Sequence, residues 1–298
     1  MAGVPVEVRP FVPDDADAVL RLAAARYTPD ARWHVGDLAW HLALTGGVGL
    51  GDHTDVWIDA GRLTAVSWWD AVEDEMAVAL TFVGPTELLP AIVAHASAAA
   101  DLPTDVVLND SEQDVLEVLT DLGFVPVDHD QFFVDLQRPL TRAATDPGLE
   151  PQLPPGFRMV TSDQCDPAHR VALHRLVWNG SALTVEGYEA MTRRWPYNPE
   201  FDQVVVAPDG SLVASTTGWL APGGTTGQLE PVGTLPPFRR RGLSRALGRS
   251  VLRAFAAVGA ERALVYARGD DAYPVPRAVY GDLGFTVHAR QQRLRLAR

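Results

Sequence analysis

Three consecutive arginines followed by a glycine are the most chemically suggestive residues of the 298-residue chain. Arg239, Arg240 and Arg241 follow an apolar segment with strand character, and Gly242 precedes an amphipathic helical pattern that begins at Leu243. A glycine-containing turn at a helix N-terminus leaves backbone N–H groups unpaired, with the positive end of the helix dipole behind them. Arginine adds charges suited to phosphate oxygens. The stretch therefore predicts a site for a phosphate-bearing ligand.

A carboxylate lies in the strand that leads to these arginines. Glu230 precedes Arg239 by nine residues. Turning an alkylammonium with a pKa near 10.4 into a nucleophile at pH 7 costs about 4–5 kcal/mol. A carboxylate that reaches the amine, directly or through water, would ease that step, so Glu230 is a candidate general base; a solvated strand glutamate is the alternative. Pro231 cannot donate to a sheet ladder, so we expect the strand to be irregular there.

Composition excludes several other kinds of site. All 25 basic residues are arginine, which excludes Walker-type phosphate loops and Schiff-base chemistry, because both need a lysine. Cys165 is the only cysteine, and no Cys/His spacing indicates a zinc site, so we expect no metal. No basic segment followed by an apolar core begins the chain, and the longest apolar run, at 88–100, is too short to span a bilayer. We predict a cytoplasmic protein with no membrane partner.

Charge is divided unevenly between the two halves of the sequence. Residues 1–150 hold 26 acids and 7 arginines, a net charge of −19, and residues 151–298 hold 12 acids and 18 arginines, a net charge of +6, which together give −13. The basic half is the expected home of a polyanionic ligand, whereas the acidic half argues against nucleic acid as a partner.

The order of predicted elements repeats once along the chain. In each half a strand is followed by two helices, three strands, a helix, a strand, a helix and closing strands. Residues 118–124 read Val-Leu-Thr-Asp-Leu-Gly-Phe, and residues 279–285 read Val-Tyr-Gly-Asp-Leu-Gly-Phe. We therefore predict a duplicated domain, with one copy at 1–140, a Pro- and Gly-containing linker at 141–155 and the second copy at 156–298.

Two of these motifs together resemble those of a known family. The pattern Arg239-x-x-Gly242-x-Ser244 resembles the acyl-CoA pyrophosphate loop of the GNAT acyltransferase superfamily, which is usually Gln/Arg-x-x-Gly-x-Gly/Ala. The segment 278–285 resembles the same family's Tyr-x-x-x-Gly-Phe motif. The resemblance implies an α/β fold with a mixed sheet, as two tandem GNAT-like acyl-CoA N-acyltransferase domains similar to the mycothiol synthase type.

The resemblance also assigns roles to particular residues. It implies that Tyr280 protonates the departing CoA thiolate, in a reaction for which Glu230 is the candidate base; a core aromatic with its hydroxyl at the rim is the alternative for Tyr280. The backbone of the strand after Glu230 is expected to hold pantetheine and to stabilise the thioester oxyanion. The residues expected to bind the acyl-CoA are Val232, Gly233, Thr234, Arg239, Arg240, Arg241, Gly242, Leu243 and Ser244.

The chain departs from the family pattern at several positions. Ser244 replaces the usual Gly or Ala, and Tyr273 stands where an Asn often lies, seven residues before Tyr280. In the first half, residues 84–87 contain no arginine and Leu119 replaces the Tyr. We therefore predict that the first domain is catalytically silent.

The acceptor is the least determined part of the prediction. Aromatic residues on the first helices of the second half, and on the loop after them, are candidates for an acceptor pocket or for simple packing: Trp178, Tyr188, Trp195, Tyr197 and Phe201. Asp202 or Glu200 is a candidate for a second amine of the substrate. We predict an acetyl-CoA-dependent N-acetyltransferase that acylates a primary amine of a small molecule by direct attack in a ternary complex. Acylation of a thiol-precursor amine, as in mycothiol synthesis, and a non-catalytic acyl-CoA sensor are the alternatives. The protein is expected to be a monomer or a homodimer.

Overall fold

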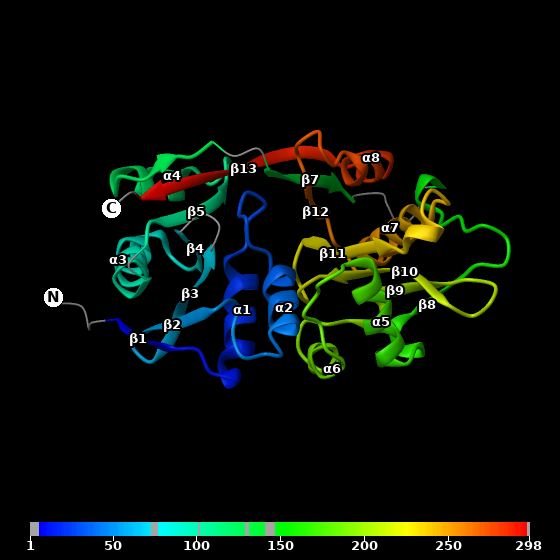
Figure 1. The fold of residues 1–298 in the computed structure, drawn as a ribbon, viewed down its shortest axis with the longest axis horizontal. Helices are drawn as coiled ribbons and strands as arrows, with labels where there is room; N and C mark the ends of the chain where they lie inside the picture. Colours follow the sequence, from blue (N-terminus) through cyan, green and yellow to red (C-terminus); the bar gives the residue numbers. More distant parts are fainter. Residues whose placement is uncertain (1–5, 73–76, 101, 129–130, 141–146, 297–298) are drawn as a thin grey trace.

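One mixed sheet runs through both halves of the protein. The computed structural model describes residues 6–72, 77–100, 102–128, 131–140 and 147–296. Within them, thirteen strands form a sheet in the order β1-β2-β3-β4-β5-β13-β7-β12-β11-β10-β9-β8, with β6 paired to β13 (Figure 1). None of the described helices is long and apolar enough to cross a bilayer.

The first half follows the predicted order of elements. Its helices and strands are β1 (Glu7–Pro10), α1 (Ala16–Arg26), α2 (Val35–Leu44), β2 (His53–Asp59), β3 (Arg62–Val72), β4 (Ala77–Val83), α3 (Leu89–Ala100), β5 (Thr104–Asn109), α4 (Gln113–Asp121), β6 (Val125–Pro126) and β7 (Phe133–Pro139). The strands β1 to β4 form an antiparallel meander, and β5 returns parallel to β4 after the crossover helix α3.

The second half repeats this order. Its elements are β8 (Arg158–Thr161), α5 (Pro167–Val177), α6 (Val185–Thr192), β9 (Asp202–Val206), β10 (Leu212–Trp219), β11 (Thr226–Thr234), α7 (Leu243–Ala257), β12 (Arg262–Arg268), α8 (Val275–Asp282) and β13 (Thr286–Leu296). The meander β8 to β11 is antiparallel, and β12 returns parallel to β11 after α7. The expected α/β fold with a mixed sheet is confirmed.

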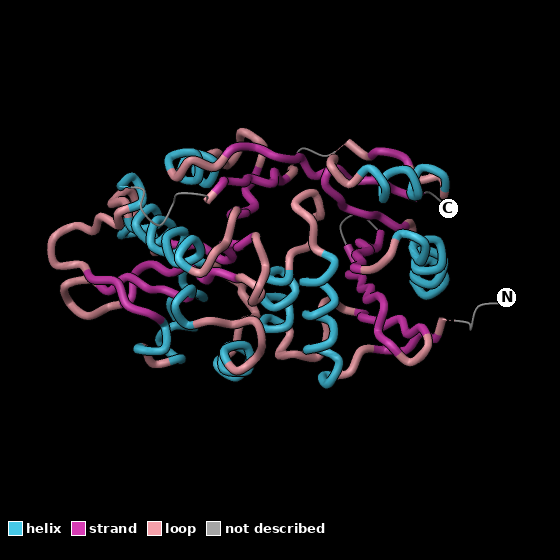
Figure 2. Tube along the Cα trace, turned by 180° about the vertical axis from the view of Figure 1, so that it is seen from behind, coloured by secondary structure: helices cyan, strands magenta, loops and turns pink. Residues whose placement is uncertain are grey.

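The last strands of the two halves are exchanged. From the first half, β7 pairs antiparallel with β12 of the second half along its whole length. The final strand, β13, pairs with β7 at one end and with β5 at the other. Figure 2 shows these strands running from one half to the other along one side of the molecule. The sheet is therefore continuous through the two halves, and the limits 1–140 and 156–298 stay a prediction.

The halves also share a core between helices. In the centre of Figure 1, α1 and α2 of the first half stand side by side, and α2 packs against α6 of the second half. Leu42 and Ala43 of α2 belong to the same buried cluster as Tyr188 and Met191 of α6. Of the predicted linker, 141–146 lies outside the described residues. The part after it packs on the second half, because Leu149 is buried in that half's core.

Each half contains one place where two parallel strands stop pairing. In the first half, β4 pairs with β5 only up to Leu80 opposite Val106. In the second half, β11 pairs with β12 only up to Gln228 opposite Leu264. We call these places the first-half fork and the second-half fork. Parallel strands that separate leave backbone N–H and C=O groups without ladder partners, so each fork exposes a strand edge.

Candidate active site

Glu230 lies at the second-half fork, where the strand that carries it is irregular. In the register between β10 and β11, Thr216 faces Val232 and Gly218 faces Leu229. Glu230 and Pro231 therefore face the single residue between them on β10, which is a bulge. The indole Nε1 of Trp219 donates to the Glu230 carbonyl at 2.7 Å. The irregularity expected from Pro231 is confirmed, and such a bulge re-aims the side chains around it.

Glu230 is half-buried as a residue, and its carboxyl group lies near charges of both signs. Burial is the main cause that raises its pKa, from 4.5 to about 8. The carboxylate of Asp37 raises this pKa further and the guanidinium of Arg32 lowers it. A carboxyl group with a pKa near neutrality is suited to exchange protons with a substrate.

Tyr280 is close enough to Glu230 for the two side chains to interact electrostatically. It lies on α8, is 8% exposed, and packs edge-on against Phe285 with ring centroids 5.9 Å apart. Burial raises the pKa of the phenol above its usual value, and the charges of Glu230 and Tyr273 add to this effect. Tyr280 therefore keeps its proton at neutral pH, as a general acid must.

The three arginines of the loop before α7 are exposed, and the loop is tied to the end of β11. Arg239 Nε donates to the carbonyl of Thr234 at 3.2 Å, and the hydroxyls of Ser244 and Thr234 are 2.8 Å apart. Gly242 has φ +80°, and no side chain caps the helix that follows it. Because α7 has fifteen residues, its uncapped N-terminus is a favourable place for an anion. The side chain of Leu243 is buried, so only its backbone can face such a ligand.

The strand edge between Glu230 and this loop is closely covered on one side. Val232, Gly233 and Thr234 pair with β10 but not with β12. A Cβ on Gly233 would lie 2.3 Å from Cη2 of Trp178, so the glycine lets this indole pack directly on the strand. The sequence prediction grouped Trp178 with the acceptor aromatics, whereas the structure places it against the strand expected to hold the donor.

A loop of the first half docks on the second-half fork, which the sequence analysis did not predict. His34 Nε2 donates to the Thr226 carbonyl at 3.1 Å, and Gln228 Nε2 donates to Asp37 Oδ1 at 2.8 Å. The backbone N–H of His34 donates to Asp37 Oδ2 at 2.9 Å. A Cβ on Gly36 would lie 2.4 Å from Gln228 Oε1, so α2 approaches β11 as closely as a glycine allows.

Arg32 of the same loop is clamped between aromatic rings of both halves. Its guanidinium carbon lies 4.2 Å from the ring centroid of Trp33 and 4.2 Å from that of Tyr266 on β12. The Tyr266 hydroxyl donates to the Arg32 carbonyl at 2.6 Å. Arg32 Nη1 lies 3.8 Å from Asp37 Oδ2. The first half therefore contributes both charged groups that shift the pKa of Glu230: Asp37 raises it and Arg32 lowers it.

Comparison with known protein families identifies the second half. Residues 171–285 match the family model of the acetyltransferase (GNAT) family. The match spans the β11 bulge, the arginine loop and Tyr280 together. The chain carries a GNAT acetyltransferase domain. It is an enzyme of the N-acyltransferase class, and the usual acyl donor of this family is acetyl-CoA.

Solved structures show that the GNAT fold extends over both halves. A GCN5-related N-acetyltransferase from Sphaerobacter thermophilus is 20% identical with a TM-score of 0.59, and the match covers 98% of this chain and 95% of that one. A tandem GNAT protein from the clavulanic acid biosynthesis pathway is 16% identical with a TM-score of 0.63, covering 98% of each chain. A GNAT-family acetyltransferase from Colwellia psychrerythraea is 11% identical with a TM-score of 0.62, covering 99% and 100%. No curated protein sequence matches the chain.

Several other candidate residues of the GNAT domain have structural partners. Asp202 is fully buried and accepts hydrogen bonds from Arg170 at 3.2 Å and from the hydroxyl of Tyr188 at 2.7 Å. Tyr197 also donates to Asp202, at 3.2 Å. Phe201 packs on Phe255 in the core. This network satisfies Asp202, so it offers no free carboxylate to a second substrate amine.

Proposed function

We propose that the second half transfers an acetyl group from acetyl-CoA to a primary amine of a small molecule, by direct attack in a ternary complex. Glu230 is the general base and Tyr280 the general acid. The backbone of Val232 to Thr234 pairs with the pantetheine arm, and the loop from Arg239 to Ser244 holds the pyrophosphate. The acceptor approaches the second-half fork.

The observation that carries this proposal is the half-buried Glu230, whose pKa is raised to about 8. Moving a proton from an alkylammonium of pKa about 10.4 to an ordinary glutamate of pKa 4.5 is uphill by about 8 kcal/mol. With Glu230 at about 8 the same transfer is uphill by about 3 kcal/mol. With this pKa, about one Glu230 carboxyl group in ten is ionised at pH 7. Burial therefore lowers the fraction of Glu230 that is ionised at pH 7, but it makes each ionised carboxylate a much stronger base.

The reaction then balances with the residues at the fork. Glu230 takes a proton from the ammonium, and the amine nitrogen attacks the thioester carbonyl. The negative charge on the carbonyl oxygen is stabilised by a backbone N–H of the β11 edge. The C–S bond breaks, the thiolate takes the proton of Tyr280, and the amide leaves with CoA. As the nitrogen becomes an amide it loses its second proton, which reprotonates Tyr280 directly or through water, and Glu230 returns its own proton to solvent.

Release of free thiol tests the proposal. Protein and acetyl-CoA are mixed with a panel of primary amines that includes an amino sugar conjugate bearing a protected thiol. We expect at least one amine to accelerate thiol release, and Tyr280→Phe to lower kcat by roughly tenfold or more. Acceleration confined to the thiol-precursor amine would favour the mycothiol-type alternative. CoA binding without acceleration by any amine would contradict the enzymatic proposal for this panel and would favour a sensor.

A further inference from the structure

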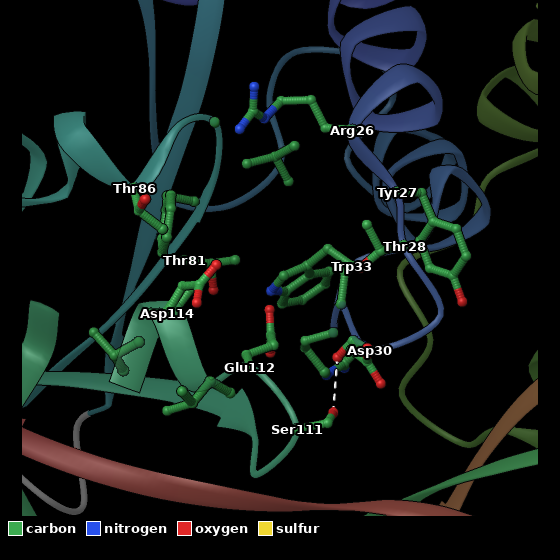
Figure 3. Close-up of a pocket in the computed structure, with 18 of the residues that line it drawn as sticks. Arg26, Tyr27, Thr28, Asp30, Trp33, Thr81, Thr86, Ser111, Glu112 and Asp114 are labelled. Atoms are coloured by element: carbon green, nitrogen blue, oxygen red, sulfur yellow. Dashed lines mark hydrogen bonds between the residues drawn. The ribbon is translucent and has the colours of Figure 1, made fainter. Parts of the chain in front are cut away.

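A pocket of about 360 Å³ lies at the first-half fork. Its walls are the C-terminal end of α1 with the loop after it, the strand ends of β4 and β5, and the start of α4. Figure 3 shows Arg26 at one margin, Trp33 projecting into the middle, and Glu112 and Asp114 on the side of α4. The volume lies within the range of small-molecule sites.

The floor of this pocket is a pair of open strand edges. The residues that follow the last β4–β5 pair, Thr81 to Val83 on one strand and Val107 and Leu108 on the other, all line it. Their outer edges are occupied, since β4 pairs with β3 and β5 with β13. Three residues of strand span about 10 Å. The open edges can therefore pair with an extended ligand carrying two or three peptide-like units.

Most of the charges around the pocket are already used within the protein. Asp30 pairs with His288 at 2.8 Å. The Glu112 carboxylate accepts the N–H of Asn109 at 2.8 Å. Arg32 is held between its two aromatic rings.

Two lining charges are available to a ligand. Arg26 on α1 and Asp114 in the first turn of α4 are exposed and make no ion pair with any residue that the structure describes. They come from opposite walls of the pocket (Figure 3). A ligand between them meets a cation on one side and an anion on the other.

The mouth of the pocket is unsuited to a nucleotide. The second half has three arginines before α7, whereas the first half has the turn Thr86–Leu88 before α3, which carries Glu87 and no arginine. A pyrophosphate there would meet a carboxylate instead of a guanidinium, and like charges repel. The first-half pocket therefore has the strand edges of an acyl-CoA site without its phosphate-binding groups.

We propose that the first-half pocket binds a di- or tripeptide-sized zwitterion in an extended conformation. Its carboxylate lies at Arg26, its ammonium lies at Asp114, and its amides pair with the open edges of β4 and β5. Trp33 provides an apolar surface for one side chain of the ligand. The inference is independent of the reaction at Glu230.

Calorimetric titration with the tripeptide Gly-Leu-Gly tests this proposal. The full-length protein is first saturated with CoA, so that the second-half fork is occupied. We expect one tripeptide per chain, and binding at least about tenfold weaker for the N-acetylated, C-amidated peptide, because each terminal charge makes a charge-assisted hydrogen bond. Absence of binding at millimolar tripeptide, or equal affinity for the blocked peptide, would overturn the proposal.

Matched variants locate the site. Arg26→Gln and Asp114→Asn should each weaken Gly-Leu-Gly binding by about tenfold. Arg62→Gln, at the exposed start of β3, and Asp121→Asn, at the other end of α4, change the same charges away from the pocket and should leave binding unchanged. Glu230→Gln should also bind the peptide normally. Equal binding by Arg26→Gln, Asp114→Asn and the parent protein would overturn the assignment to this pocket.

Discussion

The two forks have the same backbone plan and different side chains. In each, two parallel strands pair over three residues and then separate. Two residues beyond the last pair, the second half has Glu230 and the first half has Phe82. In the matching helices, Tyr280 corresponds to the fully buried Leu119. The first half has thus kept the opening and lacks both proton-transfer groups proposed for the second.

This difference shows that the topology of the strands provides the opening in both halves, whereas the side chains around it determine which chemistry is possible. A parallel pair flanked by antiparallel neighbours opens at one end in both halves. The opening of the first half is lined by charges of both signs, and that of the second half leads to an arginine loop. The first half nevertheless reaches the second fork, because its loop with Arg32 and Asp37 docks there. A half without the proposed catalytic groups therefore still shapes the surroundings of Glu230.

The proposed difference between the forks would be wrong if a carboxylate at the first-half fork contributed as much to catalysis as Glu230. Glu230→Gln removes the proposed base, and we expect kcat/KM to fall by about 10²–10⁴-fold. Glu112→Gln, the matched change at the first-half pocket, keeps an oxygen to accept the Asn109 N–H and should leave kcat/KM nearly unchanged. Steady-state thiol release measures both variants. Comparable losses in the two would show that the division between the forks is wrong.

The second difference between the halves is the arginine loop, which we propose binds the phosphates of the acyl-CoA donor. Arg239→Ala combined with Arg241→Ala removes two charges from the uncapped start of α7, and we expect CoA affinity to fall by about 10–100-fold. Arg175→Ala combined with Arg193→Ala removes the same charge from exposed positions of the same half and serves as the control. Titration calorimetry gives both affinities, and circular dichroism checks the fold. Unchanged CoA affinity in the first double variant would rule out this loop as the phosphate site.

Much of this arrangement could be predicted from the sequence because it depends on local signals. The repeated element order and the irregularity at Pro231 follow from periodicity and from the missing N–H of proline. The exchange of β7 and β13 could not be predicted, because either half could pair its own last strand and the periodicity would be the same.

The docked loop was missed for a related reason. Gln228 and Asp37 are 191 residues apart, and a hydrogen bond between them leaves no trace in a single sequence. The sequence Arg-Trp-His-Val-Gly-Asp at 32–37 predicts at most a helix start, with Asp37 as the acid three residues after the cap. Only the fold shows that this helix start faces the other half.

The contact between the halves can be tested by filling the space at Gly36. Gly36→Ala places a methyl group against Gln228 and Trp219, and overpacking of this kind costs about 1–3 kcal/mol. Gly281→Ala is the matched control, because a Cβ there meets no atom within 4 Å and alanine favours a helix. Chemical denaturation of both variants should show a loss of stability only for Gly36→Ala. Equal stability would mean that α2 and β11 are less closely packed than the structure shows.

The smallest expected effect tests whether the first half tunes the base of the second. Because Glu230 must be ionised to act, kcat/KM should rise with pH and level off above a midpoint of about 8. Asp37 raises the pKa of Glu230, so Asp37→Asn should move this midpoint to lower pH, whatever it does to the absolute rate. Asp121→Asn, on a distant helix end, should leave the midpoint unchanged. A midpoint that stays in place or rises in Asp37→Asn would show that the docked loop supports the fork only mechanically. A fall would make the first half an electrostatic part of the second half's active site.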